Sequence, residues 1–142
     1  MNPRDFLTLA TALASGKSAA EFRSAISRAY YAAFNVAAEH LHAMGFRVSR
    51  GAAAHGEVLR CLSNCGDSTV AAASTDLDKL HSIRNRADYR LDKPDIETAA
   101  TAHVNAALAK SVIDALDRTL AGPQGTQIQT NILQWRRANG YP

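Results

Sequence analysis

Apolar residues recur every three or four positions through most of this chain, which is the period of an amphipathic α-helix. The clearest helix start is the Ser-Ala-Ala-Glu capping box at residues 18–21. From there an apolar stripe runs to Gly45 without a helix-breaking residue, which predicts one long helix as the spine of the fold. The stripe consists of Phe22, Ile26, Ala29, Tyr30, Ala33, Ala37, Leu41 and Met44.

Two short helices flank this long one. The first is predicted over residues 3–15, where Pro3 suits a first-turn position and Gly16 ends the helix. Its apolar face is made by Phe6, Leu9 and Leu13. A loop over residues 45–51 leads to the second short helix, over residues 52–64, whose inward side chains are Val58 and Leu62.

Two further helices follow. The first is predicted over residues 69–90, with Asp67 and Ser68 in place to cap it, and the second over residues 94–121, begun by Pro94. Their inward positions are Val70, Leu77, Leu80, Ile83, Ala87 and Leu91 in the first, and Val104, Leu108, Val112, Leu116 and Leu120 in the second. No alternating run predicts a strand. We therefore expect an all-α fold, an up-and-down bundle with two long helices and two or three shorter ones.

The helical domain is expected over residues 1–121, followed by a polar tail over residues 122–142 with a short helix around residues 128–137. The 142 residues are 46% hydrophobic and 20% charged, which suffices for one core. No apolar run approaches the ~20 residues that span a bilayer, and the first residues lead into no signal-peptide core. We expect a cytoplasmic protein that does not contact membranes.

Charge and cysteine content limit the kinds of ligand that the chain is expected to bind. The net charge of +3 permits a phosphate-bearing partner, and an Arg side chain can bind phosphate through two parallel hydrogen bonds. Cys61 and Cys65 share a helix face, with His55 nearby in sequence, but this set has too few ligands for an ordinary zinc site. The two cysteines are interpreted as small buried residues, and neither a metal nor a cofactor is expected.

Two segments carry more information than the rest. Residues 27–34 read SRAYYAAF and place Tyr30 on the apolar stripe, with Tyr31 turned about 100° from it. Residues 81–90 read HSIRNRADYR and place a polar stripe beside the apolar one. That stripe consists of His81, Arg84, Asn85 and Asp88. It forms either a solvated face or a binding site.

Together these two segments resemble the HEPN family, small helical domains of prokaryotic defence and toxin–antitoxin systems, over roughly residues 5–120. The resemblance implies a bundle that pairs as a homodimer. It also implies metal-independent ribonuclease activity in members that carry an Arg, a polar residue and then a His, with two copies meeting across a cleft. Many short members are encoded beside a nucleotidyltransferase-like antitoxin, so the resemblance also implies such a partner.

Residue by residue, the family motif falls on Arg84 and Asn85, while Tyr89 occupies the position where a His is expected. His81, one turn before Arg84, is the alternative imidazole. The resemblance further suggests phosphate contacts from Arg28, Arg86 and Arg90, and structural roles for Tyr30, Tyr31 and Asp88. The expected function is RNA or nucleotide binding in a toxin–antitoxin or defence module, with ribonuclease activity resting on an incomplete motif. The alternative is a non-catalytic adaptor for a nucleotidyltransferase partner.

Overall fold

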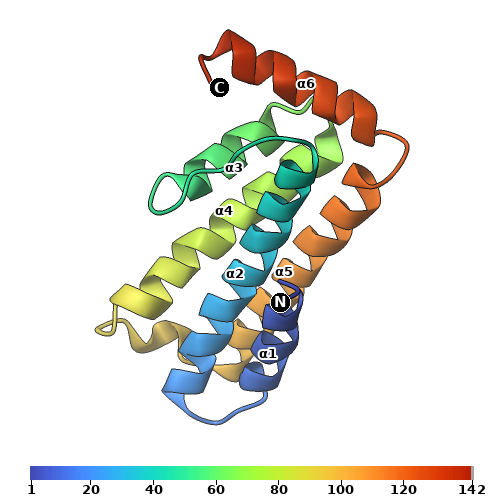
Figure 1. The fold of residues 1–142 in the computed structure, drawn as a ribbon. Coiled ribbons are helices and arrows are strands. Elements are labelled where there is room, and N and C mark those ends of the chain that lie inside the picture. Colours follow the sequence, from blue (N-terminus) through green and yellow to red (C-terminus); the bar gives the residue numbers. More distant parts are fainter. Residues whose placement is uncertain (142) are drawn as a thin grey trace.

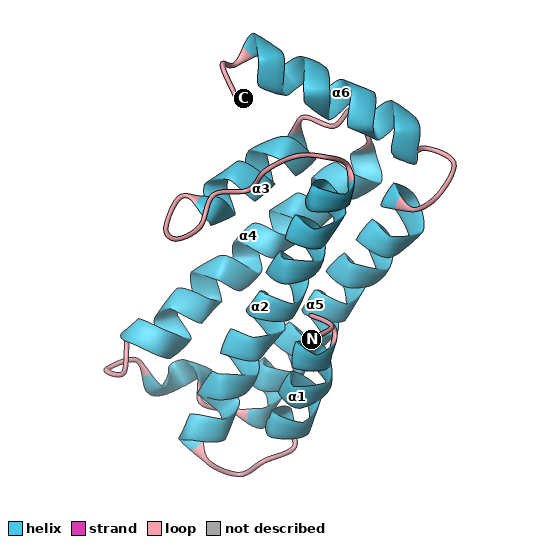
Figure 2. Ribbon diagram, viewed as in Figure 1, coloured by secondary structure: helices cyan, strands magenta, loops and turns pink. Residues whose placement is uncertain are grey.

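The computed structural model describes residues 1–141, which form six α-helices and one short 3-10 helix (Figure 1). The helices are α1 (Asp5–Ala14), α2 (Ala19–Ala43), α3 (Ala54–Ser63), α4 (Ser68–Tyr89), η1 (Pro94–Ile96), α5 (Ala99–Leu120) and α6 (Gly125–Ala138). Figure 2 shows helices joined by loops, with no strand in the described part of the chain. The predicted all-α class is therefore confirmed.

Helix α2 forms the centre of the bundle, packed against α1, α4 and α5. It begins where predicted, because the Ser18 side chain accepts a hydrogen bond from the Glu21 amide while the Glu21 carboxylate accepts one from the Ser18 amide. Its inward face is rich in fully buried alanines, at positions 25, 29, 32, 33 and 37. These small side chains let neighbouring helix axes approach closely.

Three positions predicted to be buried are exposed. Leu91 is 72% exposed because α4 ends at Tyr89, and Val104 is 64% exposed because α5 buries Ala102, Ala106 and Ala109 instead. In α1, Leu9 is 45% exposed, since the small Ala10 and Ala14 face α2. In α1 and α5 the packed face follows the small residues rather than the largest apolar ones.

The predicted start of the last long helix at Pro94 is wrong. Pro94 begins only a 3-10 turn, and α5 starts after Thr98, whose side chain accepts a hydrogen bond from the Thr101 amide at 3.1 Å. Thr98 has extended backbone geometry, as a cap requires, so the side-chain cap and not the proline sets the start of α5.

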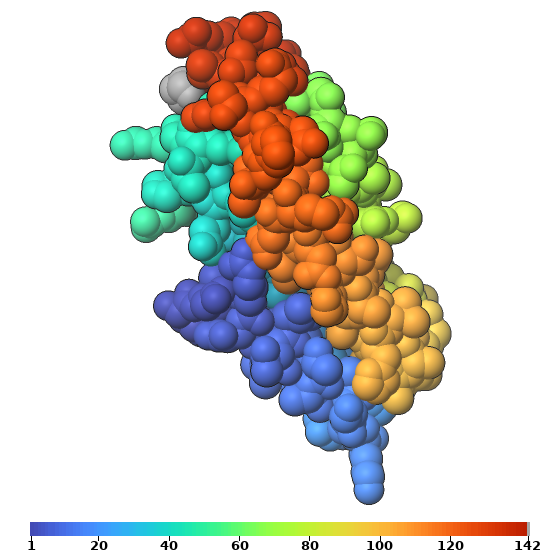
Figure 3. Space-filling view, turned by 90° about the vertical axis from the view of Figure 1, so that its right-hand side faces the viewer, coloured from blue at the N-terminus to red at the C-terminus, as the bar shows by residue number. Residues whose placement is uncertain are grey.

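Helix α6 completes the core at one end of the elongated molecule (Figure 3). The short helix expected around residues 128–137 is present and extends further in both directions. Ile128 and Ile132 are buried in the main apolar cluster with residues of α2, α3 and α4, so that core continues beyond residue 121. None of the described helices combines the length and apolar character that crossing a membrane requires.

Candidate functional site

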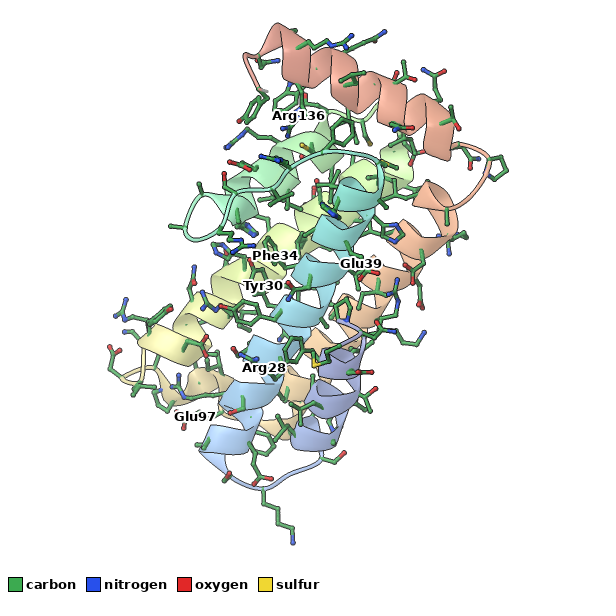
Figure 4. All side chains as sticks on the ribbon, viewed as in Figure 1. Arg28, Tyr30, Phe34, Glu39, Glu97 and Arg136 are labelled. Carbon is green, nitrogen blue, oxygen red and sulfur yellow. The ribbon has the colours of Figure 1, made fainter. Side chains whose placement is uncertain are left out.

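A cleft of about 850 Å³ opens between α2, α3 and α4, and the segment joining α2 to α3 forms part of its wall. Aromatic, imidazole and guanidinium side chains line it, among them Tyr30, Tyr31, His55, His81, Arg84 and Tyr89. Figure 4 shows the side chains of Tyr30 and Phe34 on the side of α2 that faces α3 and α4. The cleft therefore brings together residues of both segments that the sequence singles out.

Arg84 is held in this cleft by a set of polar contacts. Its Nη2 donates hydrogen bonds to the hydroxyl of Tyr31 at 2.6 Å and to that of Tyr89 at 3.3 Å, and its Nη1 donates to Asn85 Oδ1 at 3.0 Å. Its Nε lies 2.9 Å from Asp88 Oδ2 without the alignment of a hydrogen bond. Only 14% of the side chain is exposed, so the cation is fixed at the cleft wall.

A second guanidinium, that of Arg28, also lies against the Tyr31 ring. The Arg28 Cζ is 4.9 Å from the centre of the Tyr31 ring, and the Arg84 Cζ is 5.0 Å from it. Both distances fit cation–π contacts. Tyr31 thus joins two cations, one from α2 and one from α4.

Asp88 links α4 to α2 by accepting a hydrogen bond from the Ser27 hydroxyl at 3.1 Å. The same carboxylate pairs with Arg84, so it sets the position of that guanidinium relative to α2. Asp88 therefore contacts both α2 and the Arg84 guanidinium.

Two imidazoles also line the cleft. The rings of His55 and His81 stack with their centres 3.6 Å apart and 15° between their planes. His55 Nδ1 lies 3.0 Å from the Tyr30 hydroxyl, and His55 Nε2 lies 3.2 Å from Asp78 Oδ1. Burial, followed by the neighbouring His55 and Arg84, lowers the pKa of His81, which keeps its ring neutral near pH 7.

Tyr30 forms the back of the cleft and is 4% exposed, in agreement with its predicted place in the core. Burial raises the pKa of its hydroxyl above the usual value for tyrosine. The group is therefore neutral and acts as a hydrogen-bond partner.

The predicted residues divide into two groups. Those around the cleft or in contact with its lining are Tyr30, Tyr31, Arg28, His81, Arg84, Asn85, Asp88 and Tyr89. Arg86 and Arg90 are not among the lining residues. Arg86 pairs with Asp95 at 2.6 Å and Arg90 with Asp92 at 3.2 Å, all close to the end of α4.

Sequence reasoning did not assign His55 or Arg50 to this cleft, although both line it. His55 lies on α3 and comes next to His81 only because α3 packs against α4. No spacing rule along the chain links these two histidines. Cys61 and Cys65, near His55 in sequence, are buried free thiols as predicted, and burial raises the pKa of each.

Comparison with family models, with curated proteins and with solved structures finds no match for this chain. Its chemistry must therefore be argued from the cleft itself. A fixed guanidinium with phenol hydroxyls beside it suits a phosphate group. The Tyr89 ring, on a residue that is 68% exposed, offers a face on which an unpaired base can stack. A neutral imidazole can accept a proton.

Proposed function

We propose that this chain is a HEPN-like component of a toxin–antitoxin or defence module that binds single-stranded RNA in the cleft between α2, α3 and α4. The observation that carries the proposal is that cations, an exposed aromatic ring and imidazoles line one cleft. Arg84 and Tyr89 lie in contact at the cleft, and Arg28 lies on the same Tyr31 ring as Arg84. Single-stranded RNA needs these groups, because its backbone carries charge and its bases stack on aromatic rings.

The contacts of Arg84 define how it would act on RNA. Tyr31, Tyr89 and Asn85 accept hydrogen bonds from it, and Asp88 offsets its charge. A phosphate would compete with the Tyr89 hydroxyl, which makes the longest of these hydrogen bonds. In this proposal Arg84 is the main phosphate contact, Arg28 and Arg50 add weaker charge attraction, and Tyr89 stacks on a base.

For cleavage, His81 is the better-placed imidazole, since it lies one helical turn from Arg84 on α4 and its ring is neutral. It would take the proton of the ribose 2′-hydroxyl while Arg84 stabilises the charge on phosphorus. Such cleavage needs no metal ion.

One observation favours the adaptor alternative. The two imidazoles stack face to face instead of standing on opposite sides of an open space. A general acid and a general base must reach different oxygen atoms of the phosphodiester. In the adaptor version, the chain binds a nucleotidyltransferase-like partner, and its cleft binds RNA or nucleotide without cleaving it.

The test is fluorescence anisotropy with a labelled single-stranded RNA pool in EDTA, with gel analysis of the same samples for cleavage. Arg84→Ala should weaken binding about 10- to 100-fold, the size of one lost charged hydrogen-bond contact. The matched control is Arg118→Ala, an exposed arginine on α5, which contributes nothing to the cleft lining.

Equal affinities for Arg84→Ala and Arg118→Ala would overturn RNA binding at this cleft. Cleavage by the wild type that is lost in His81→Ala and kept in Tyr89→Phe would support His81 as the base. Loss in Tyr89→Phe alone would implicate the phenol. Binding without any cleavage would favour the adaptor.

A further inference from the structure

We propose that His55, Asp78 and His81 form a binding site for a divalent transition-metal ion such as Zn²⁺. One ligand comes from α3 and two come from neighbouring turns of α4. The site goes beyond the proposed RNA binding and does not depend on it. None of its three residues is a proposed RNA-binding contact, and His81 is shared only with the proposed cleavage step.

The distances between the ligand atoms of the three side chains allow them to bind one ion. One ligand atom from each of the three side chains lies within 4.8 Å of the others, and His55 Nε2 is 3.2 Å from Asp78 Oδ1. Two imidazoles and a carboxylate suit Zn²⁺ and neighbouring transition metals better than Mg²⁺ or Ca²⁺, which prefer oxygen ligands alone. The geometry therefore points to a borderline ion such as Zn²⁺ or Co²⁺.

Tyr30 supports His55 in the way that second ligand shells do. The Tyr30 hydroxyl lies 3.0 Å from His55 Nδ1, and a hydroxyl can either donate or accept. In the His55 tautomer that carries its proton on Nε2, Tyr30 donates to Nδ1 and Nε2–H donates to Asp78. With a metal, Nδ1–H donates to Tyr30, and the Nε2 lone pair turns to the ion beside Asp78. His55 exchanges these two states without losing a net proton.

His81 has ring nitrogens that are available to coordinate a metal ion. Within the described chain neither of its ring nitrogens has a hydrogen-bond partner, and stacking on His55 is its closest ring contact. Because the His55 and His81 ring planes are only 15° apart, the in-plane lone pairs of the two rings lie in nearly parallel planes and do not converge on one ion. Binding therefore requires the His81 ring to turn about its Cβ–Cγ bond, and no hydrogen bond opposes that turn.

The ion has access to the site and room for a further ligand. The Asp78 side chain is 60% exposed, so an ion can reach the carboxylate from solvent. His55 and His81 both line the cleft. Three protein ligands leave a fourth tetrahedral position open, as in catalytic zinc sites. That position would face the cleft, where a water molecule or an oxygen of a ligand could occupy it.

The test uses the full chain, with Zn²⁺ followed by isothermal titration calorimetry and Co²⁺ followed by visible absorption. The wild type should bind one ion with a nitrogen- and oxygen-ligand Co²⁺ spectrum. His81→Ala and Asp78→Asn should weaken binding at least tenfold. Tyr30→Phe should weaken it about 10- to 100-fold, as loss of a second-shell partner does. His103→Ala, which removes an exposed histidine of α5, should leave binding unchanged.

Two results would overturn the site. One is the absence of Co²⁺ absorption bands in the wild type, and the other is unchanged affinity in a His55→Ala, His81→Ala double variant whose circular dichroism remains helical. A sulfur-to-cobalt charge-transfer band would assign the ion to Cys61 and Cys65 and would also overturn it. RNA binding is measured in EDTA and metal binding without RNA, so failure of one is distinguishable from failure of the other.

Discussion

At the scale of single residues, Tyr30 connects the core to the cleft. Its ring lies 5.7 Å from that of Phe34 in a stacked pair and 5.1 Å from that of Tyr31 in an edge contact. Its hydroxyl meets His55, while the rest of the side chain is buried among apolar residues of the main cluster. The same residue therefore stabilises the fold through its ring and positions His55 through its hydroxyl.

These two roles can be separated by mutation. Tyr30→Ala should lower the free energy of unfolding by about 3–5 kcal/mol, as truncation of a large buried aromatic does. Tyr30→Phe keeps the ring and should cost only about 1 kcal/mol, the net value of one hydrogen bond. Urea denaturation followed by circular dichroism measures both. If Tyr30→Ala proves no more costly than Tyr30→Phe, the ring does not carry the packing.

At the scale of helices, Arg23 of α2 holds the end of α4. The residue is 8% exposed, and its Nη1 donates to the carbonyls of Arg86 and Ala87 at 3.1 and 2.9 Å. Its Nη2 donates to the carbonyls of Arg90 and Lys93, and its Nε donates to Glu97 at 2.8 Å. These carbonyls belong to the last turn of α4 and to the loop after it, where those of Arg86 and Arg90 also accept hydrogen bonds from the Arg90 and Lys93 amides. Arg23 thus adds to the local backbone cap of α4 and links the end of that helix to α2.

Arg23→Ala should destabilise the protein by about 3–5 kcal/mol, because it leaves the Ala87 and Lys93 carbonyls and the Glu97 carboxylate without this partner. Arg23→Lys keeps the charge but cannot reach several carbonyls at once, so it should recover only part of the loss. Thermal unfolding compares both with Arg118→Ala. A shift for Arg23→Ala as small as for that control would show that water replaces the guanidinium at no cost.

At the scale of the whole molecule, the end of α4 presents apolar surface next to the cleft. Tyr89 is 68% exposed and contacts the Arg84 side chain, and Leu91, two residues further along the chain, is 72% exposed. Exposed large apolar residues beside a polar site suit contact with another protein chain. The family resemblance suggests a two-fold pair at this face, in which each copy would complete the cleft of the other.

We predict a dimer by sedimentation velocity at micromolar concentration, dissociated by Leu91→Asp. Val104→Asp is the matched control, since Val104 is 64% exposed on α5 and outside the cleft. Burying a charge at an apolar interface is costly, whereas adding one to a solvated face is not. A wild type that remains monomeric, alone and with a nucleotidyltransferase-like partner, would contradict this arrangement.

The helix boundaries show how much of the structure the local sequence pattern predicts. Ser18 with Glu21 predicts the start of α2, and Asp67 predicts the start of α4, where its side chain accepts from the Val70 amide at 2.9 Å. Pro94 misleads because a proline fits the first turn of a 3-10 helix as well as that of an α-helix. Caps and breakers act within a few residues, so the sequence alone determines where most helices begin and end.

The sequence by itself therefore determined an all-helical chain, its central helix and the Arg84 stripe. Only the tertiary structure decided that His55 meets His81, that Arg23 caps a helix distant in sequence, and that Val104 faces outward. The physical reason is that helical periodicity defines faces within one helix. Which faces of two helices meet depends on their rotation and on how closely small residues let them pack, and that is set by the whole core.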